Sequence, residues 1–365
     1  MKFEYGDRSV DLKRYPPTDN RSLKPWSAAD EYMLTFLSEE SFNSLHLWND
    51  RFGFLGTTLA QHHPTHSITY RSQDTSLTKN LERNGLEIRQ QDRTPITETP
   101  GHTCQIALMK VPKSLDLFHL QIHQAAQMLQ HEGKVICGFM TRHFSPQLLT
   151  FAESLYHSVE QSRAWKKARL LILSSPKPVD ERKPIPMNQV AYSPDHVLQQ
   201  FPGVFSAGQI DPATRFFLEN ITLRESDRRI LDVGTGNGII SAVLQRRHDD
   251  REFHMTDDSF LAIESARLNV SGDPACFHAT DTLTSLPPLS FDLVVSNPPF
   301  HLEHENNIEV SVRLFQEVRQ VLNPSGHFML VANKHLNYKT HLEKLYHHVS
   351  IIAQNRKFVI YECRP

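Results

Sequence analysis

The chain has 365 residues, enough for two domains of the usual size of about 100–200 residues each. Apolar residues make up 39%, charged residues 22%, and the formal net charge is -2, which excludes disordered, collagen-like and highly charged chains. Basic side chains are in slight excess up to residue 190 and acidic side chains beyond it. This asymmetry is compatible with a polyanion bound to the first half, but it is too small to decide.

No apolar run reaches the ~18 residues of a membrane span, and residues 1–7 lack the pattern of a secretory signal. We therefore expect a cytoplasmic protein that does not cross a membrane. The four cysteines, Cys104, Cys137, Cys276 and Cys363, are widely separated and form no Cys-x-x-Cys pair. Their spacing favours reduced thiols over a disulfide framework or a zinc site.

Two groups in the first half combine cations with aromatic or apolar residues: 110–113, with Lys110 and Lys113, and 165–169, with Trp165. Lysine and arginine bind phosphates, and aromatic rings stack on unpaired bases, so both groups are candidates for holding RNA. A solvated helix face is the alternative for the run at 165–169. Proline-rich residues follow, and we expect a semi-rigid linker over 176–190.

The second half opens on an apolar strand that ends at Asp232 and runs into Gly234, Gly236 and Gly238. Alternate glycines permit a tight turn and a close backbone approach to a ligand, and the helix that follows points its free N–H groups at that ligand. The spacing differs from dinucleotide and P-loop signatures. It favours a nucleoside with an amino-acid tail, and a plain tight turn is the alternative.

Two further strands each end near a carboxylate. Asp257 ends the second strand about 20 residues after the loop, where an acid is placed to hold two ribose hydroxyls. Asp258, beside it, we interpret as solvated. Asp281 follows the strand through Cys276, and its carboxylate is placed either to accept an adenine amine or to cap its own loop.

A strand over 291–296 is broken at once by Asn297, Pro298, Pro299 and Phe300. The prolines remove two N–H donors and leave bare carbonyls. The Asn297 oxygen and the Pro298 carbonyl are then placed to accept both hydrogens of an –NH2 group, and Phe300 to stack on the attached ring. An Asx turn at Asn297 and a core position for Phe300 are the alternatives.

Histidines occur close together at His62, His63 and His66 and at His301 and His304. Neither group has the acidic or cysteine partners of a metal motif. In a chain with 21 histidines such groups arise by chance. We therefore expect no metal.

Taken together, these motifs resemble the class I S-adenosylmethionine-dependent methyltransferases, in the branch that carries Asn-Pro-Pro-aromatic and alkylates amino nitrogens. The resemblance implies an α/β fold with a mixed seven-stranded Rossmann-like sheet, helices on both faces and a final antiparallel hairpin at 349–363. It also implies that Asp232 and the glycine loop face the methionine part of S-adenosylmethionine, that Asp257 holds the ribose, and that Asp281 lies beside the adenine.

Internal repetition predicts two tandem copies of this fold. Residues 133–143 recur as 326–335, and 155–157 recur as 345–347. The sequence thus predicts a degenerate domain over 1–175, the linker, and a catalytic domain over 191–365.

The first copy has lost the features that would bind the cofactor. Bulky residues at 47–54 replace the glycine loop, Ser72 falls near the place of Asp257, and 110–113 fall where Asn297 and its prolines stand. A cofactor cannot approach such a backbone closely. We therefore predict that the first domain binds no S-adenosylmethionine and serves to hold RNA.

Residues 201–214 are similar to the lead-in of the ribosomal RNA guanine-N2 methyltransferases, and residues 8–32 to that of the branch acting on 23S rRNA. The resemblance implies methylation of N2 of a guanine, with 23S rRNA or a large-subunit precursor as partner. The alternatives are a 16S rRNA guanine, a DNA adenine, a protein glutamine amide, or a non-catalytic RNA-binding assembly module. The oligomeric state is left open.

Overall fold

The structure is a computed structural model that describes residues 1–18, 20, 22–87, 89–272, 274–298, 301–302, 305–306 and 308–365. It divides into two compact units, Met1–Pro186 and Met187–Pro365. The boundary falls within the segment 176–190. Among the described residues, no helix is long and apolar enough to cross a lipid bilayer.

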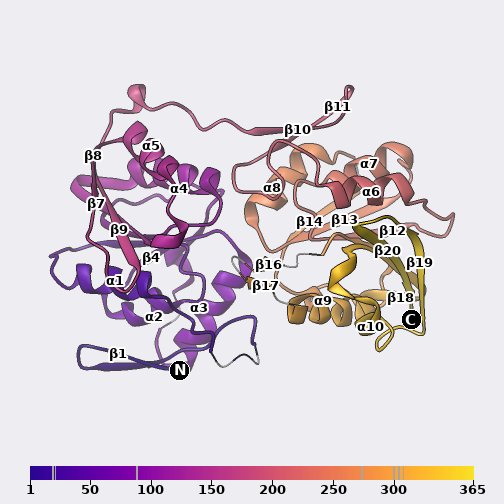
Figure 1. Cartoon of the computed structure of the whole chain (residues 1–365), viewed down its shortest axis with the longest axis horizontal. Coiled ribbons are helices and arrows are strands. Elements are labelled where there is room, and N and C mark those ends of the chain that lie inside the picture. Colours follow the sequence, from indigo (N-terminus) through magenta and orange to yellow (C-terminus); the bar gives the residue numbers. More distant parts are fainter. Residues whose placement is uncertain are drawn as a thin grey trace. The chain divides into compact units, whose positions relative to one another are not determined.

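The first unit holds a mixed seven-stranded sheet with helices packed against it (Figure 1). Its strands are β1 (Lys2–Tyr5), β2 (Arg8–Asp11), β3 (Leu45–Trp48), β4 (Thr65–Ile68), β5 (Arg93–Pro95), β6 (Cys104–Lys110), β7 (Leu129–Met140), β8 (Tyr156–Gln161) and β9 (Ala168–Pro176). Its helices are α1 (Ala28–Leu37), α2 (Phe54–Thr58), α3 (Arg71–Arg83), α4 (Leu115–Met128) and α5 (Pro146–Leu155), with short 3-10 turns η1 (Ala60–His62), η2 (Gln90–Asp92), η3 (Thr141–His143) and η4 (Val179–Glu181).

The second unit repeats this arrangement. Its strands are β10 (Asn188–Ser193), β11 (His196–Gln200), β12 (Arg229–Val233), β13 (Glu252–Asp257), β14 (Ala275–Ala279), β15 (Phe291–Ser296), β16 (His301–Leu302), β17 (Glu305–Asn306), β18 (Leu322–Asn333), β19 (His348–Gln354) and β20 (Phe358–Arg364). Its helices are α6 (Pro212–Asn220), α7 (Ile239–Arg247), α8 (Phe260–Asn269), α9 (Ile308–Val321) and α10 (Lys339–Leu342), with η5 (Leu283–Ser285) and η6 (Lys334–Leu336).

The two sheets have the same topology. Their strand orders are β5-β4-β3-β6-β7-β9-β8 and β14-β13-β12-β15-β18-β20-β19, and in each the penultimate strand, β9 or β20, is antiparallel to both neighbours while the other six run parallel. The predicted fold, two tandem methyltransferase-like sheets each closed by an antiparallel hairpin, is confirmed. The sequence repeat also has a structural counterpart, because the Tyr156 hydroxyl donates to the Ile122 carbonyl and the Tyr346 hydroxyl to the Phe315 carbonyl, each at 2.8 Å.

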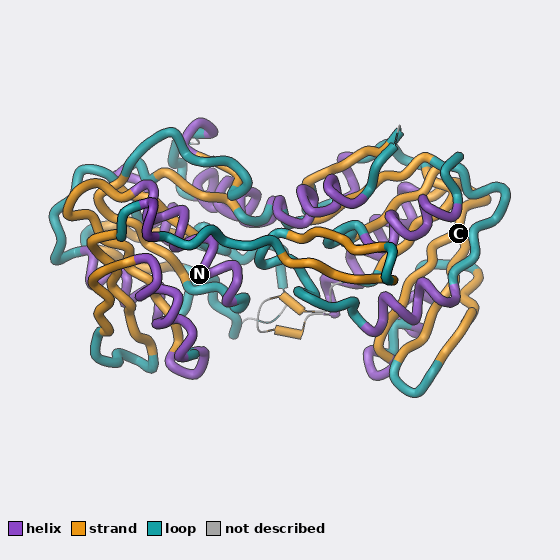
Figure 2. Tube along the Cα trace, turned by 90° about the horizontal axis from the view of Figure 1, so that it is seen from above, coloured by secondary structure: helices purple, strands orange, loops and turns teal. Residues whose placement is uncertain are grey.

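Apolar strands buried on both faces build these sheets, as parallel strands require. In the second unit one core cluster packs α6 and α7 on one face, and another packs α9 and α10 on the other. Seen from above, helices flank the strands of each unit (Figure 2). Asp211 caps α6 by accepting from the Thr214 N–H at 2.9 Å, with Pro212 at the first helical position. Such starts place helix N-termini beside the carboxyl ends of the strands, where open α/β sheets bind ligands.

Candidate active site

The glycine loop joins β12 to α7 in the conformation that its composition predicts. Gly234, Gly236 and Gly238 have φ of 70°, 58° and 80°, the left-handed region that glycine occupies without strain. A Cβ on Gly238 would lie 3.0 Å from the Ala266 Cα, so this glycine lets α7 approach α8. A Cβ on Gly236 would meet nothing within 4 Å. Gly236 therefore faces open space, as a loop that receives a ligand must.

Asp232, in β12, is fully buried beneath this loop. Its Oδ2 accepts from the Thr235 hydroxyl at 2.9 Å and from the Ser241 hydroxyl at 2.8 Å. Its Oδ1 is buried and has no partner among the described residues. Burial raises the pKa of Asp232 to about 6, against the lowering effect of these hydrogen bonds. The unpartnered oxygen is an acceptor that a bound ligand can satisfy.

Asp257 ends β13 and closes the loop from the other side. Its Oδ2 accepts from the Gly236 N–H at 3.0 Å, and its Oδ1 accepts from the Ser259 N–H at 2.9 Å. Each oxygen keeps a further lone pair for a hydroxyl donor. Burial raises the pKa of Asp257 to about 6, partly offset by those two backbone hydrogen bonds.

Asp281 lies just past β14 at the same edge, since the Thr280 N–H donates to the Asp257 carbonyl at 2.9 Å. Its Oδ2 is buried without a hydrogen-bond partner among the described residues. That oxygen caps no loop amide here. It is therefore a second buried acceptor without a donor among the described residues.

Asn297 follows β15, the strand next to β12, in which Ser296 pairs with Val233. Its side-chain nitrogen donates to the Asp211 carboxylate at 3.0 Å and to the Thr214 hydroxyl at 2.9 Å. Both amide hydrogens are thereby used, and the amide oxygen is an acceptor without a donor among the described residues. Sequence reasoning placed Asp211 and Thr214 in the lead-in and missed this contact, which spans 86 residues.

Of the other residues predicted in this turn, the structure describes Pro298 alone. Pro298 is buried directly after Asn297. Phe300, predicted to stack on the substrate ring, lies outside the described residues, as do Pro299 and His304.

The same edge of the first unit is built differently. Gly53 precedes α2 with φ of 68°, as Gly238 precedes α7. Arg51 and Gly236 each stand two residues before these glycines, so Arg51 is the equivalent of Gly236. The Arg51 guanidinium donates to the Ser72 hydroxyl. The strand registers place Ile68, and not Ser72, at the position of Asp257, because Ser67 pairs with Trp48 as Thr256 pairs with Val233. The sequence alignment that put Ser72 there is wrong by four residues.

The registers also make Lys110 the equivalent of Asn297 in the first unit, since Met109 pairs with Trp48 as Ser296 pairs with Val233. Lys110 forms a 3.1 Å ion pair with Asp30, the third residue of α1, and Thr214 is the third residue of α6. A polar link between strand end and helix start thus exists in both units, with different chemistry.

The cationic run of the first unit is a turn and not a helix face. Lys166 and Lys167 have φ of 46° and 64° and reverse the chain between β8 and β9. Lys166 pairs with Glu31 at 3.0 Å and lies over the Trp165 ring, 4.3 Å from its centroid.

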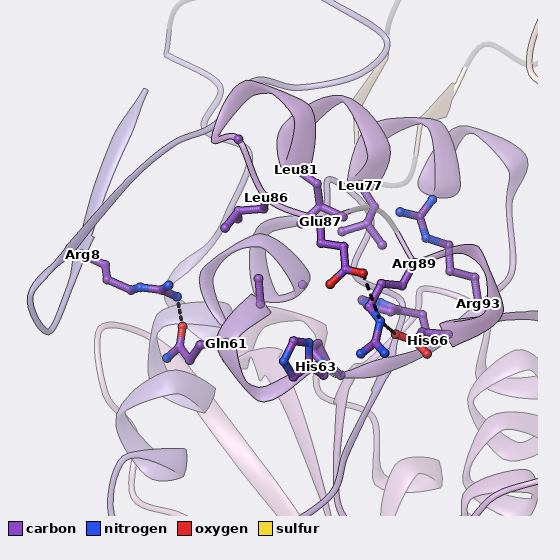
Figure 3. Close-up of a pocket in the computed structure, with 15 residues that line it drawn as sticks. Arg8, Gln61, His63, His66, Leu77, Leu81, Leu86, Glu87, Arg89 and Arg93 are labelled. Carbon is purple, nitrogen blue, oxygen red and sulfur yellow. Dashed lines mark hydrogen bonds and ion pairs between the residues drawn. The ribbon is translucent and has the colours of Figure 1, made fainter.

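A cavity of about 260 Å³ in the first unit lies at the opposite edge, by the amino ends of β4 and β5 (Figure 3). Three arginines line it. Arg8 bonds Gln61, Arg89 lies 3.7 Å from Glu87, and Arg93 pairs with Asp74 at 2.6 Å. Each guanidinium has such a partner, but Arg89 Nε and Arg93 Nη2 are buried without a hydrogen-bond partner among the described residues.

One group of potential metal ligands occurs among the described residues: Glu252, His254 and Cys276, with ligand atoms within 4.8 Å of one another. It lies at the amino end of β13, away from the glycine loop. Arg229 pairs with Glu252 at 3.0 Å, and His254 Nε2 lies 2.7 Å from the same carboxylate. These contacts account for the carboxylate without an ion.

Comparison with known proteins agrees with this organisation. Residues 1–178 match the RLMG N-terminal domain family, and residues 195–362 match the methyltransferase small domain family. In fold the chain is similar to the T. thermophilus 16S rRNA N2 G1207 methyltransferase in complex with AdoMet and guanosine, with a TM-score of 0.77 and 21% identity, over 100% of this chain and 97% of that one.

In sequence the chain is 33% identical to the ribosomal RNA large subunit methyltransferase G of Streptomyces coelicolor, over 99% of this chain and 98% of that protein. Both domains are therefore shared, in the same order. The chain belongs to the ribosomal RNA large subunit methyltransferase G family.

Proposed function

We propose that this protein transfers a methyl group from S-adenosylmethionine to the exocyclic N2 amine of a guanine in 23S rRNA, in the cytoplasm. One observation carries the proposal. Asp211 and Thr214 take both amide hydrogens of Asn297, which leaves an acceptor oxygen, and an amine is a donor that needs one. Family membership supports the large ribosomal subunit as the source of that amine.

The residues around the glycine loop fit the cofactor. Gly236 leaves open space for a backbone approach, and Asp232 offers an unpartnered buried oxygen for the amino-acid part. Asp257 has lone pairs left for two ribose hydroxyls, and Asp281 has a free acceptor for the adenine amine. When bound, S-adenosylmethionine supplies an electrophilic methyl group.

The task of the chain's own residues is to prepare a poor nucleophile. The lone pair of a guanine amine is delocalised into the ring. Hydrogen bonds from its two hydrogens to the Asn297 oxygen and the Pro298 carbonyl favour a pyramidal nitrogen with an available lone pair. Phe300 would hold the ring by stacking. The surplus proton leaves to solvent after transfer, so no general base is assigned.

In this proposal the first domain, residues 1–175, holds RNA and binds no cofactor. The side chain of Arg51 stands where Gly236 opens the loop of the second unit, and Lys110 stands where Asn297 would be. At the turn between β8 and β9, Lys166 pairs with Glu31, and the exposed Lys167 is placed for phosphate contacts. A target base in a helix would have to be unpaired or flipped out to reach the site.

The test is transfer of tritium from labelled S-adenosylmethionine to protein-free 23S and 16S rRNA, followed by nucleoside analysis. Label in N2-methylguanosine of 23S rRNA, lost in Asn297→Ala, is the expected result. Asn323→Ala is the matched control, because that amide also bonds a carboxylate, Asp292 at 2.7 Å, but at the amino end of the strands. Label on 16S rRNA alone would replace the substrate, and cofactor binding without transfer to RNA or particles would contradict the proposal.

A further inference from the structure

The turn between β19 and β20 carries two adjacent cations, Arg356 and Lys357, both exposed. The Asn355 side chain shapes the turn by accepting from the N–H groups of Lys357 and Phe358, each at 2.8 Å. Phe358 pairs with Asn333, the last residue of β18. The turn therefore lies at the carboxyl edge of the sheet, the edge that also carries Asn297.

Two more exposed cations adjoin this turn. The Lys334 N–H donates to the Lys357 carbonyl at 2.9 Å. Arg215 directly follows Thr214, whose hydroxyl holds Asn297, and the rings of the next residue, Phe216, and of Phe358 are 6.4 Å apart. We name these four residues the catalytic-edge cations: Arg215, Lys334, Arg356 and Lys357. None of them forms an ion pair with a carboxylate among the described residues.

The first unit has the same turn at the same place. Lys166 and Lys167 stand where Arg356 and Lys357 stand, because the Thr141 N–H donates to the Lys167 carbonyl at 2.8 Å. There the charge is partly neutralised by Glu31, which pairs with Lys166 at 3.0 Å. Glu31 is the fourth residue of α1, and the fourth residue of α6 is Arg215.

This comparison separates two properties of the duplicated fold. The paired cations of the turn occur in both copies, including the one whose loop carries Arg51 in place of a glycine, so the turn does not serve the cofactor. In the catalytic unit the neutralising carboxylate is replaced by a further cation. Four exposed cations without an ion-pair partner among the described residues thus adjoin the amine acceptor, in a half of the chain whose overall charge is negative.

We propose that the catalytic-edge cations bind backbone phosphates of the RNA, next to the nucleotide whose base enters the site. The inference rests on the proposed function and adds to it a surface on the catalytic unit itself. A base that reaches Asn297 brings its own flanking phosphates to this edge. Exposed lysine and arginine bind such phosphates with release of counterions, which makes affinity depend on salt.

The experiment measures binding of the full chain to protein-free 23S rRNA across a series of salt concentrations. For Arg356→Glu with Lys357→Glu, we expect weaker binding and a slope of log affinity against log salt that is smaller by about 1.5, from about 0.7–0.9 per lost phosphate contact. Arg215→Glu, which installs the carboxylate of the first unit, should reduce the slope by about half as much.

Arg319→Glu is the matched control. Arg319 is an exposed cation in the last turn of α9, at the amino edge of the same sheet, and its reversal should leave the slope unchanged. The affinity for S-adenosylmethionine, measured by calorimetry, should be the same in all variants. Equal affinity would show that each variant is folded.

Equal slopes for the turn variant and the Arg319 control would overturn this inference while the proposed function stands, and an acidic protein partner would then be the occupant to test. Failure of the unaltered chain to bind RNA would overturn both.

Discussion

The carboxyl edges of the two sheets share a backbone and differ in their side chains. Each starts a helix from a left-handed glycine, Gly53 or Gly238, and each links a strand end to a helix start, through Lys110 or Asn297. In the second unit the loop is open at Gly236, whereas in the first an arginine takes that position. We therefore propose that topology alone does not make a cofactor site, and that a few side chains on one scaffold decide it.

The carboxylates under the two loops illustrate the same difference. Asp50 accepts from the Leu55 and Gly56 N–H groups with its two oxygens, at 3.1 and 2.7 Å. Asp232 spends one oxygen on Ser241 and Thr235 and keeps the other free. Burial raises the pKa of both carboxyls to about 6. The first unit thus satisfies its buried acid internally, and the second leaves an acceptor for a ligand.

The largest effect is expected from copying the first unit into the second at the amine site. Asn297→Lys removes the acceptor oxygen and places a cation beside Asp211 and Thr214, so methyl transfer should fall by about 1,000-fold or more. Cofactor affinity should change little, because the residues that we propose to hold the cofactor lie on or directly after β12, β13 and β14, and Asn297 follows β15. Single-turnover transfer and calorimetry measure the two quantities. A variant that keeps a tenth of the rate would show that Asn297 does not bind the amine.

Gly236→Arg copies the first unit's loop. We expect S-adenosylmethionine to bind about 100-fold more weakly, a loss of about 2.7 kcal/mol, since the new side chain fills the open space. Strain from the positive φ should also lower the free energy of unfolding by about 1 kcal/mol. Gly6→Arg is the matched control, because Gly6 has φ of 56° and open space around it in the β1–β2 turn. It should show the strain and no change in cofactor affinity.

Thr214→Val tests the orientation of Asn297 without moving it. The hydroxyl that accepts from the amide is lost and the shape is kept, so kcat should fall about tenfold for a hydrogen bond worth about 1.4 kcal/mol. KM for RNA and cofactor affinity should stay as they are. Thr214→Ser restores the hydroxyl and should restore kcat. A loss that serine does not rescue would assign Thr214 to packing instead.

Cofactor affinity should depend on pH through Asp257. Its pKa is raised to about 6, so the carboxyl is ionised above that pH and protonated below it. The ionised form accepts two hydroxyls, and the dissociation constant should therefore rise about tenfold as pH falls from 7 to 5. Titration calorimetry over this range checks it. In Asp257→Asn the affinity should be weaker at pH 7 and the dependence flatter, and an unchanged slope would remove Asp257 from the ribose site.

The smallest effect concerns the shared scaffold. Tyr156→Phe and Tyr346→Phe each remove a buried hydroxyl that donates to an equivalent helix carbonyl, of Ile122 or Phe315, and each should lower the free energy of unfolding by about 1–2 kcal/mol. Neither change should alter cofactor affinity. Urea unfolding of the two variants measures the losses. Losses that differ by more than about 2 kcal/mol would show that the two equivalent hydrogen bonds do not contribute equally to stability.

Much of this organisation could be predicted from local patterns. The loop glycines need positive φ, and Asp257 ends a strand, so both follow from short sequence signals. The contact of Asn297 with Asp211 spans 86 residues and depends on how α6 packs, which no local pattern contains. Ser72 was misaligned because α2 has five residues and α7 has nine, so spacing does not carry over between the copies.

The unpartnered Oδ1 of Asp232 also affects the stability of the protein between reactions. A buried acceptor without a donor lowers the stability of the ligand-free catalytic unit, and a ligand that supplies the donor restores it. In the first unit, both oxygens of Asp50 already accept hydrogen bonds. We therefore expect the methyl donor, when bound, to protect the carboxy-terminal half from proteolysis. The supply of the donor would then set the lifetime of the enzyme as well as its rate.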